Sequence, residues 1–161
     1  MKDIQVIEEF ERSWEYTRKM TSTFIDCVPE EKWNFTHHAN FAPLNKQFCH
    51  MVKVYGCYVE AVQSRMLDMK KKNSIYSGSG DRKSIQESLS KLDRDFAIEL
   101  NNLKENGLEG FVVDVFGMQM GFTEFTHVMI QHEVGHFGIW ANYAAFGGFK
   151  TPAMWQSDWK L

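Results

Sequence analysis

Two histidines four positions apart, His132 and His136, are the residues of this chain best placed to do chemistry. Positions four apart on an α-helix lie about 40° apart around its axis, so both imidazoles project from one side and can share a metal ion. That side is apolar, because Met129 precedes the pair and Trp140 follows it at helical spacing. Two imidazoles on an apolar face are costly without partners. The pair therefore predicts a divalent metal site, and two core histidines bonded to backbone or water are the alternative.

The same residues spell HExxH, the signature of zinc peptidases in which the glutamate activates water. Such an enzyme needs a further protein ligand, usually downstream, but after His136 the chain holds no histidine and one carboxylate, Asp158. The five-residue motif therefore matches the peptidase signature, but the rest of the chain does not supply the further ligand that a peptidase needs. Glu133 is offset by about 100° from His132 around the helix, which leaves open whether it reaches the ion.

A third ligand has to come from another element, and His50 is the best candidate because it lies within a predicted helix. Val54, Cys57 and Ala61 follow it at helical steps, so its stripe is apolar and can face the interior of a bundle. Three protein ligands leave one coordination position open, which is typical of a reactive site. Spacing alone also allows His50 to be an ordinary core or boundary histidine.

Apolar residues that recur at steps of three and four predict four amphipathic helices. The first carries an apolar stripe over residues 7–28, and Pro29 ends it. The second runs from Pro43 to about residue 70, and residues 73–81 form a loop rich in glycine and serine. Asp81 caps the third helix, which stops at Gly107.

Residues 107–121 carry few helical signals and are rich in valine and phenylalanine. This composition predicts an extended segment or small hairpin. Thr123 is the expected cap of the fourth helix, which ends at residues 147–148, and Trp155 and Trp159 of the tail are expected to pack back on the body. Four long helices with one insertion indicate an all-α four-helix bundle, in one domain over residues 1–161. Ligand sites in such bundles are built from facing side chains.

Composition and charge narrow the classes of function. The net charge of −3 comes from 18 basic and 21 acidic residues spread along the chain, which argues against nucleic acid or an anionic membrane as a partner. Three cysteines without a CxxC pair are typical of reduced thiols in a cytosolic protein. The N-terminal residues are too charged for a signal peptide, and no stretch reaches about 18 consecutive apolar residues. We therefore expect a soluble cytoplasmic protein.

The order of these features resembles the DinB/YfiT-like family of metal-dependent enzymes. The resemblance rests on a histidine within FCHMV (48–52), a long gap, the motif HEVGHFG (132–138) and a short tail, GGFKTPAMW (147–155). It covers nearly the whole chain and implies an up-down-down-up bundle, often a homodimer, whose divalent metal is bound by His50, His132 and His136. Many members continue the last motif as HRGQ, and this chain lacks that arginine and glutamine, which weakens the transfer of activity more than the transfer of metal binding.

The resemblance implies a thiol-dependent S-transferase or isomerase, in which the metal binds a low-molecular-weight thiol. A metal-dependent hydrolase and a non-catalytic metal-binding stress-response protein are the alternatives. Three imidazoles suit zinc, nickel, copper or iron, and we expect zinc or nickel. The partner is then a small-molecule substrate.

Overall fold

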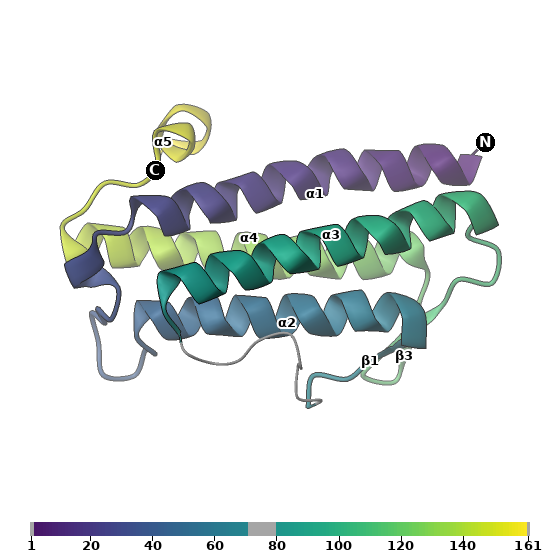
Figure 1. Ribbon diagram of the computed structural model, residues 1–161, viewed down its shortest axis with the longest axis horizontal. Coiled ribbons are helices and arrows are strands. Elements are labelled where there is room, and N and C mark those ends of the chain that lie inside the picture. The colour runs from purple at the N-terminus through teal and green to yellow at the C-terminus, as the bar shows by residue number, and fades with distance from the viewer. Residues whose placement is uncertain (1, 71–79, 161) are drawn as a thin grey trace.

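Four long helices lie side by side in the computed structural model, which describes residues 2–70 and 80–160 (Figure 1). They are α1 (Lys2–Cys27), α2 (Leu44–Ser64), α3 (Arg82–Asn106) and α4 (Phe122–Gly147). A 3₁₀ turn, η1 (Glu30–Lys32), follows α1, and a short helix, α5 (Ala153–Trp159), lies near the C-terminus. Three short strands complete the described chain: β1 (Met66–Leu67), β2 (Val113–Val115) and β3 (Met118–Met120).

The helices form an up-down-down-up bundle, as predicted. In Figure 1, α1 and α4 run in one direction, and α2 and α3 run in the other. Each long helix packs against two neighbours, so that the order around the bundle is α1, α3, α2, α4. The two antiparallel seams, α1/α3 and α2/α4, therefore lie on opposite sides of the bundle.

Most helices begin and end where the local sequence signals predicted. Pro29 follows the end of α1, and Pro43 is the N-cap of α2. The Asp81 carboxylate accepts a hydrogen bond from the Ser84 amide at 2.9 Å and caps α3 as predicted. Gly107, with φ of 80°, stops the same helix, and Gly148, with φ of 72°, stops α4.

Two predicted helix ends were wrong. Helix α2 stops at Ser64 rather than near residue 70, because Arg65 adopts a left-handed conformation (φ 60°) and the next residues leave to form β1. Helix α4 begins at Phe122, so Thr123 is not its cap. The N-cap is Gly121, whose amide donates to the Glu124 carboxylate at 3.1 Å. The predicted loop over residues 73–81 lies mostly outside the described residues.

The segment between α3 and α4 is a hairpin, as its composition predicted. Strands β2 and β3 pair in antiparallel register, with Val115 opposite Met118. Phe116 and Gly117, both with positive φ, make the two-residue turn. Strand β1 adds to β2 in parallel, which ties the end of α2 to the hairpin.

Aromatic side chains fill one end of the core and hold the tail. Trp155 is fully buried, lies 4.9 Å from Phe24 between ring centroids and donates from Nε1 to the Met20 carbonyl at 3.1 Å. Trp159 is 37% exposed and rests at the surface against Phe137, with ring centroids 5.7 Å apart. Both tryptophans pack back on the bundle as expected. Among the described helices, none combines the length and apolar character that crossing a membrane requires.

Candidate metal centre

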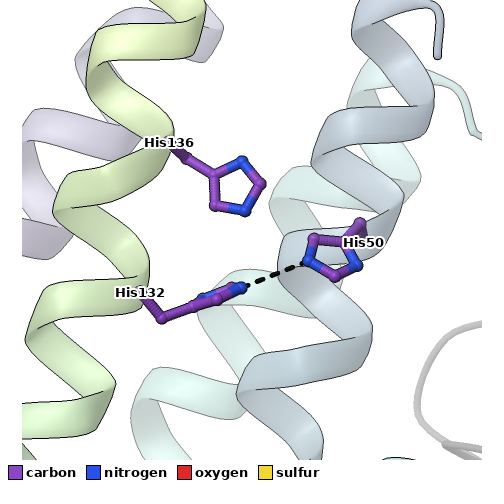
Figure 2. Close-up of side chains that lie close together, drawn as sticks. All are labelled: His50, His132 and His136. Carbon is purple, nitrogen blue, oxygen red and sulfur yellow. Dashed lines mark hydrogen bonds between the residues drawn. The ribbon is translucent and has the colours of Figure 1, made fainter. Parts of the chain in front are cut away.

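Three histidines from two antiparallel helices meet at the α2/α4 seam (Figure 2). His50 comes from α2, and His132 and His136 come from successive turns of α4. The Nε2 atoms of His50 and His132 are 3.2 Å apart, and one ring nitrogen from each of the three residues lies within 4.8 Å of the others. Figure 2 shows the three rings pointing toward one another. The structure thus brings together the residues that the sequence singled out, although they are up to 86 positions apart.

The three histidines of the cluster differ in how deeply they are buried. His136 is 9% exposed, His132 is half-buried and His50 is exposed. His50 therefore differs from the sequence expectation of a residue facing the interior, whereas Val54 and Cys57 of the same stripe are buried. Because His50 lies at the outer edge of the seam, a small molecule can reach the cluster from solvent on that side.

The imidazoles are held in the neutral form that binds metals. Burial, and to a smaller extent the charge of His50, lower the pKa of His132 to about 4. Burial, together with the charges of His132 and His50, likewise lowers the pKa of His136 to about 4. The His50 side chain is exposed but still partly desolvated by its neighbours, and this partial desolvation and the positive charge of Lys53 lower its pKa. At neutral pH a cation therefore does not have to displace protons from these three rings.

The donor set of the cluster fits a metal. Each of the three residues offers one ring nitrogen to the same space, where no ionised side chain of the described residues competes for them. Neutral imidazoles gathered at one point are costly without a partner, and a cation among the three rings would give each of them one. Three imidazole donors suit zinc, nickel, copper or iron(II), so the residues could hold a divalent ion of this group.

Glu133 lies between the two histidines in sequence but points into the core instead of toward them. Its side chain is 3% exposed, and its Oε1 accepts hydrogen bonds from Arg18 Nη1 at 2.6 Å and Thr21 Oγ1 at 2.5 Å, both on α1. Arg18 Nε also donates to Asp93 of α3 at 2.9 Å. Glu133 therefore fixes α4 against α1, and it is not placed to act as a base at the histidine cluster.

Sequence reasoning missed the partners of Glu133. A signal was present, because Arg18 follows Trp14 by four positions and so falls on the buried stripe of α1. A charged residue at such a position requires a buried partner of opposite charge. Burial acts to lower the pKa of Arg18, but the carboxylates of Glu133 and Asp93 outweigh it and raise that pKa above its ordinary value.

Two aromatic residues border the cluster. The Trp140 ring centroid lies 5.8 Å from that of His136, and the Tyr58 centroid lies 6.0 Å from that of His132.

His127 is exposed on α4 and does not join the cluster. His37 stacks on Phe146 with ring centroids 5.0 Å apart, so it belongs to an aromatic contact at the end of the bundle.

Residues 1–158 match the DinB family. The chain belongs to this family. A search of curated proteins found no match. Among solved structures, a DinB-like protein from Bacillus cereus ATCC 10987 superposes with a TM-score of 0.73 over 91% of this chain and 95% of that chain, at 20% identity. At this identity the likeness establishes the fold alone, which this chain therefore shares with a DinB-like protein.

One departure from the DinB pattern has a structural explanation. The residue after the last histidine is Phe137, where many relatives are expected to carry arginine. Phe137 is buried, and its ring centroid lies 5.0 Å from that of Trp155 and 5.8 Å from that of Trp140. In this DinB chain the Phe137 side chain therefore packs the C-terminal tail against α4.

Proposed function

We propose that this protein is a metal-dependent enzyme in which His50, His132 and His136 hold one divalent ion, zinc or nickel. The observation that carries the proposal is the convergence of three imidazoles from two helices, with one nitrogen of each within 4.8 Å of the others. Three protein ligands leave a position for a small molecule, and the exposed edge at His50 gives access to it.

The charge of the cluster supports an anionic ligand at that position. Imidazoles are neutral ligands, so they leave the charge of a divalent ion uncompensated. The positive charge of Lys53 acts on His50 in addition. A divalent cation lowers the pKa of a thiol that it binds and so supplies a thiolate nucleophile at neutral pH. We therefore favour a low-molecular-weight thiol as substrate or co-substrate.

The reaction class that fits is thiol transfer to an electrophile, or an isomerisation that begins with such an addition. In the transfer the thiol loses its proton to solvent, a sulfur–carbon bond forms, and the leaving group departs with its electron pair. Hydrolysis is less well supported, because Glu133, the carboxylate next to the ligands in sequence, is engaged by Arg18 and Thr21. A metal-binding protein without turnover would share the site but not the reaction.

Metal binding is tested by elemental analysis of the purified protein and of three variants, His50→Ala, His132→Ala and His136→Ala. We expect stoichiometric divalent metal in the wild type and a severe loss in each variant, with helical circular dichroism retained. His127→Ala is the matched control, because His127 is an exposed histidine on the same helix. Absence of stoichiometric metal, together with no change in stability on adding metal, would refute the proposal. Full occupancy in His50→Ala would remove that residue from the site.

Thiol binding is tested by thermal unfolding of metal-loaded and chelator-treated protein with 2-mercaptoethanol, and with ethylene glycol as the oxygen analogue. A ligand at 100 times its Kd stabilises the native state by about 2.7 kcal/mol. We expect the thiol, and not the glycol, to stabilise the metal-loaded form, and neither to stabilise His132→Ala. Equal stabilisation of the chelator-treated protein would contradict a thiol site at the metal.

A further inference from the structure

The two helices that carry the histidine cluster surround its outer edge with positive charge. Residues 32–59 contain no aspartate or glutamate, and residues 125–149 contain one, Glu133. Glu133 does not reach the outer edge, because it lies in the core, where α1 supplies its partners. The basic residues of α2 are Lys46 and Lys53. In a chain of net charge −3, the edge of the α2/α4 seam is therefore locally cationic.

Lys46 and Lys53 flank His50 on one side of α2. Lys46 lies four positions before His50 and Lys53 three positions after it, and residues at these spacings are neighbours on a helix surface. All three side chains are exposed. A lysine carries its ammonium group on a flexible four-carbon stem. Both ammonium groups can therefore reach a small molecule that binds at the cluster from the side of His50.

The charge of both lysines is available at this edge. The positive charge of Lys53 acts on the cluster, because it contributes to the lowered pKa of His50. The backbone amide of Lys46 donates to the Pro43 carbonyl at 2.8 Å. Its ammonium group forms no ion pair or hydrogen bond with any residue of the described ranges 2–70 and 80–160. An incoming anion would therefore not have to displace a carboxylate from Lys46.

The α4 side of the edge is open. Gly135 lies between the two histidines of α4 and about 60° around the helix from His132. It is exposed, and a Cβ atom built on it would meet no other atom within 4 Å. A molecule bound at the cluster therefore has free space on the side of α4 and ammonium groups on the side of α2.

We propose that Lys46 and Lys53 are specificity-determining residues that select thiols carrying a carboxylate a few bonds away from the sulfur. The sulfur binds at the open position of the metal ion, and the carboxylate pairs with the two ammonium groups. A neutral thiol lacks the second contact, so charge complementarity discriminates between the two classes. The selection rests on the proposed function, because it requires the metal ion at the three histidines.

The probes are 4-mercaptobutyrate and 4-mercapto-1-butanol, two thiols of similar length that differ in charge. Each is titrated by calorimetry into the full-length, zinc-loaded protein at neutral pH and low ionic strength, where exposed charges are least screened. We expect the carboxylate thiol to bind more tightly. The metal ion itself attracts anions, so variants are needed to assign this preference to the lysines.

The double variant Lys46→Gln/Lys53→Gln removes both charges and keeps polar side chains. An exposed ion pair contributes about threefold to a binding constant, so the variant is expected to bind 4-mercaptobutyrate about tenfold more weakly. Its affinity for 4-mercapto-1-butanol is expected to stay unchanged. Lys46→Arg/Lys53→Arg keeps both charges and is expected to keep the preference. Lys19→Gln, at an exposed lysine of α1, is the control and is expected to change neither affinity.

Elemental analysis of each variant ensures that affinities are compared at equal zinc content. The expected result is a loss confined to the carboxylate thiol and to the glutamine variant. Unchanged binding of 4-mercaptobutyrate in that variant, or an equal loss for both thiols, would overturn the selection and leave the proposed function standing. If neither thiol binds the zinc-loaded wild type, the thiol function and the selection are both wrong.

Discussion

Replacement of Glu133 by alanine separates a structural glutamate from a catalytic one. In the wild type, Glu133 accepts hydrogen bonds from Arg18 and Thr21, and all three side chains are buried. The variant leaves the Arg18 guanidinium with one remaining carboxylate, that of Asp93, whose side chain is 43% exposed. It also removes the near acceptor of the Thr21 hydroxyl, whose other acceptor, the Thr17 carbonyl, is 3.4 Å away.

Breaking a buried ion pair by removal of one partner costs about 3–5 kcal/mol, because an uncompensated charge stays buried. Asp93 retains part of the compensation, so we place Glu133→Ala near the lower end, about 3 kcal/mol. For a chain of this length a loss of that size lowers Tm by roughly 6–12 °C. The effect is a large share of a total stability of about 5–15 kcal/mol.

The assay is urea unfolding at neutral pH, followed by circular dichroism, with metal content measured in parallel. Glu133→Gln keeps an acceptor oxygen and is expected to lose less stability than Glu133→Ala. The double variant Arg18→Met/Glu133→Met removes both charges and is expected to recover much of the loss. If Glu133→Ala unfolds at the wild-type urea concentration but loses catalytic turnover, Glu133 acts at the metal and the structural assignment is wrong.

Three further predictions test the fold and the protonation of the site. Trp155→Ala is expected to lose about 3–5 kcal/mol of stability in urea unfolding because its ring is fully buried, whereas Trp159→Ala, at a partly exposed ring, is expected to lose much less; equal losses would contradict the packing. Asp81→Ala removes the cap of α3 and is expected to cost about 1 kcal/mol in the same assay, and Asp81→Asn, which can still cap, is expected to cost less. In chelator-treated protein the pKa values of His132 and His136 are about 4, below the ordinary 6.5, so the unfolded chain binds more protons between these values and Tm is expected to fall as pH drops from 6.5 toward 4. The decrease in Tm should be smaller in His132→Ala. An equal decrease in that variant would assign the titration to groups other than His132.

Much of the fold could be predicted from the sequence because its signals are local. Helical periodicity, the Asp81 cap and the Gly107 stop depend on residues within one or two turns, and each predicted feature is present. The valine-rich, glycine-punctuated segment over residues 107–121 likewise forms its hairpin from neighbouring residues. The shared side of His132 and His136 follows from the helix pitch alone.

The wrong boundaries have non-local causes. Nothing near residue 65 breaks the apolar period, and α2 stops there because Met66 and Leu67 pair with β2, almost fifty residues later. At the start of α4, threonine is a good cap in isolation, but the carboxylate of Glu124 bonds back to the Gly121 amide and starts the helix earlier. Local propensity does not distinguish between such alternatives, because tertiary contacts supply the difference in free energy.

The sequence by itself determined that two histidines share one face of a helix and that a third lies in another helix. Only the tertiary structure decided that His50 lies at the height of His132 across the α2/α4 seam, so that the nitrogens of all three residues converge. It also decided which way Glu133 points, because the angle of a side chain around its own helix does not say which neighbour lies on that side. Arg18, 115 positions away, occupies that side, and the HExxH glutamate is thereby part of the core.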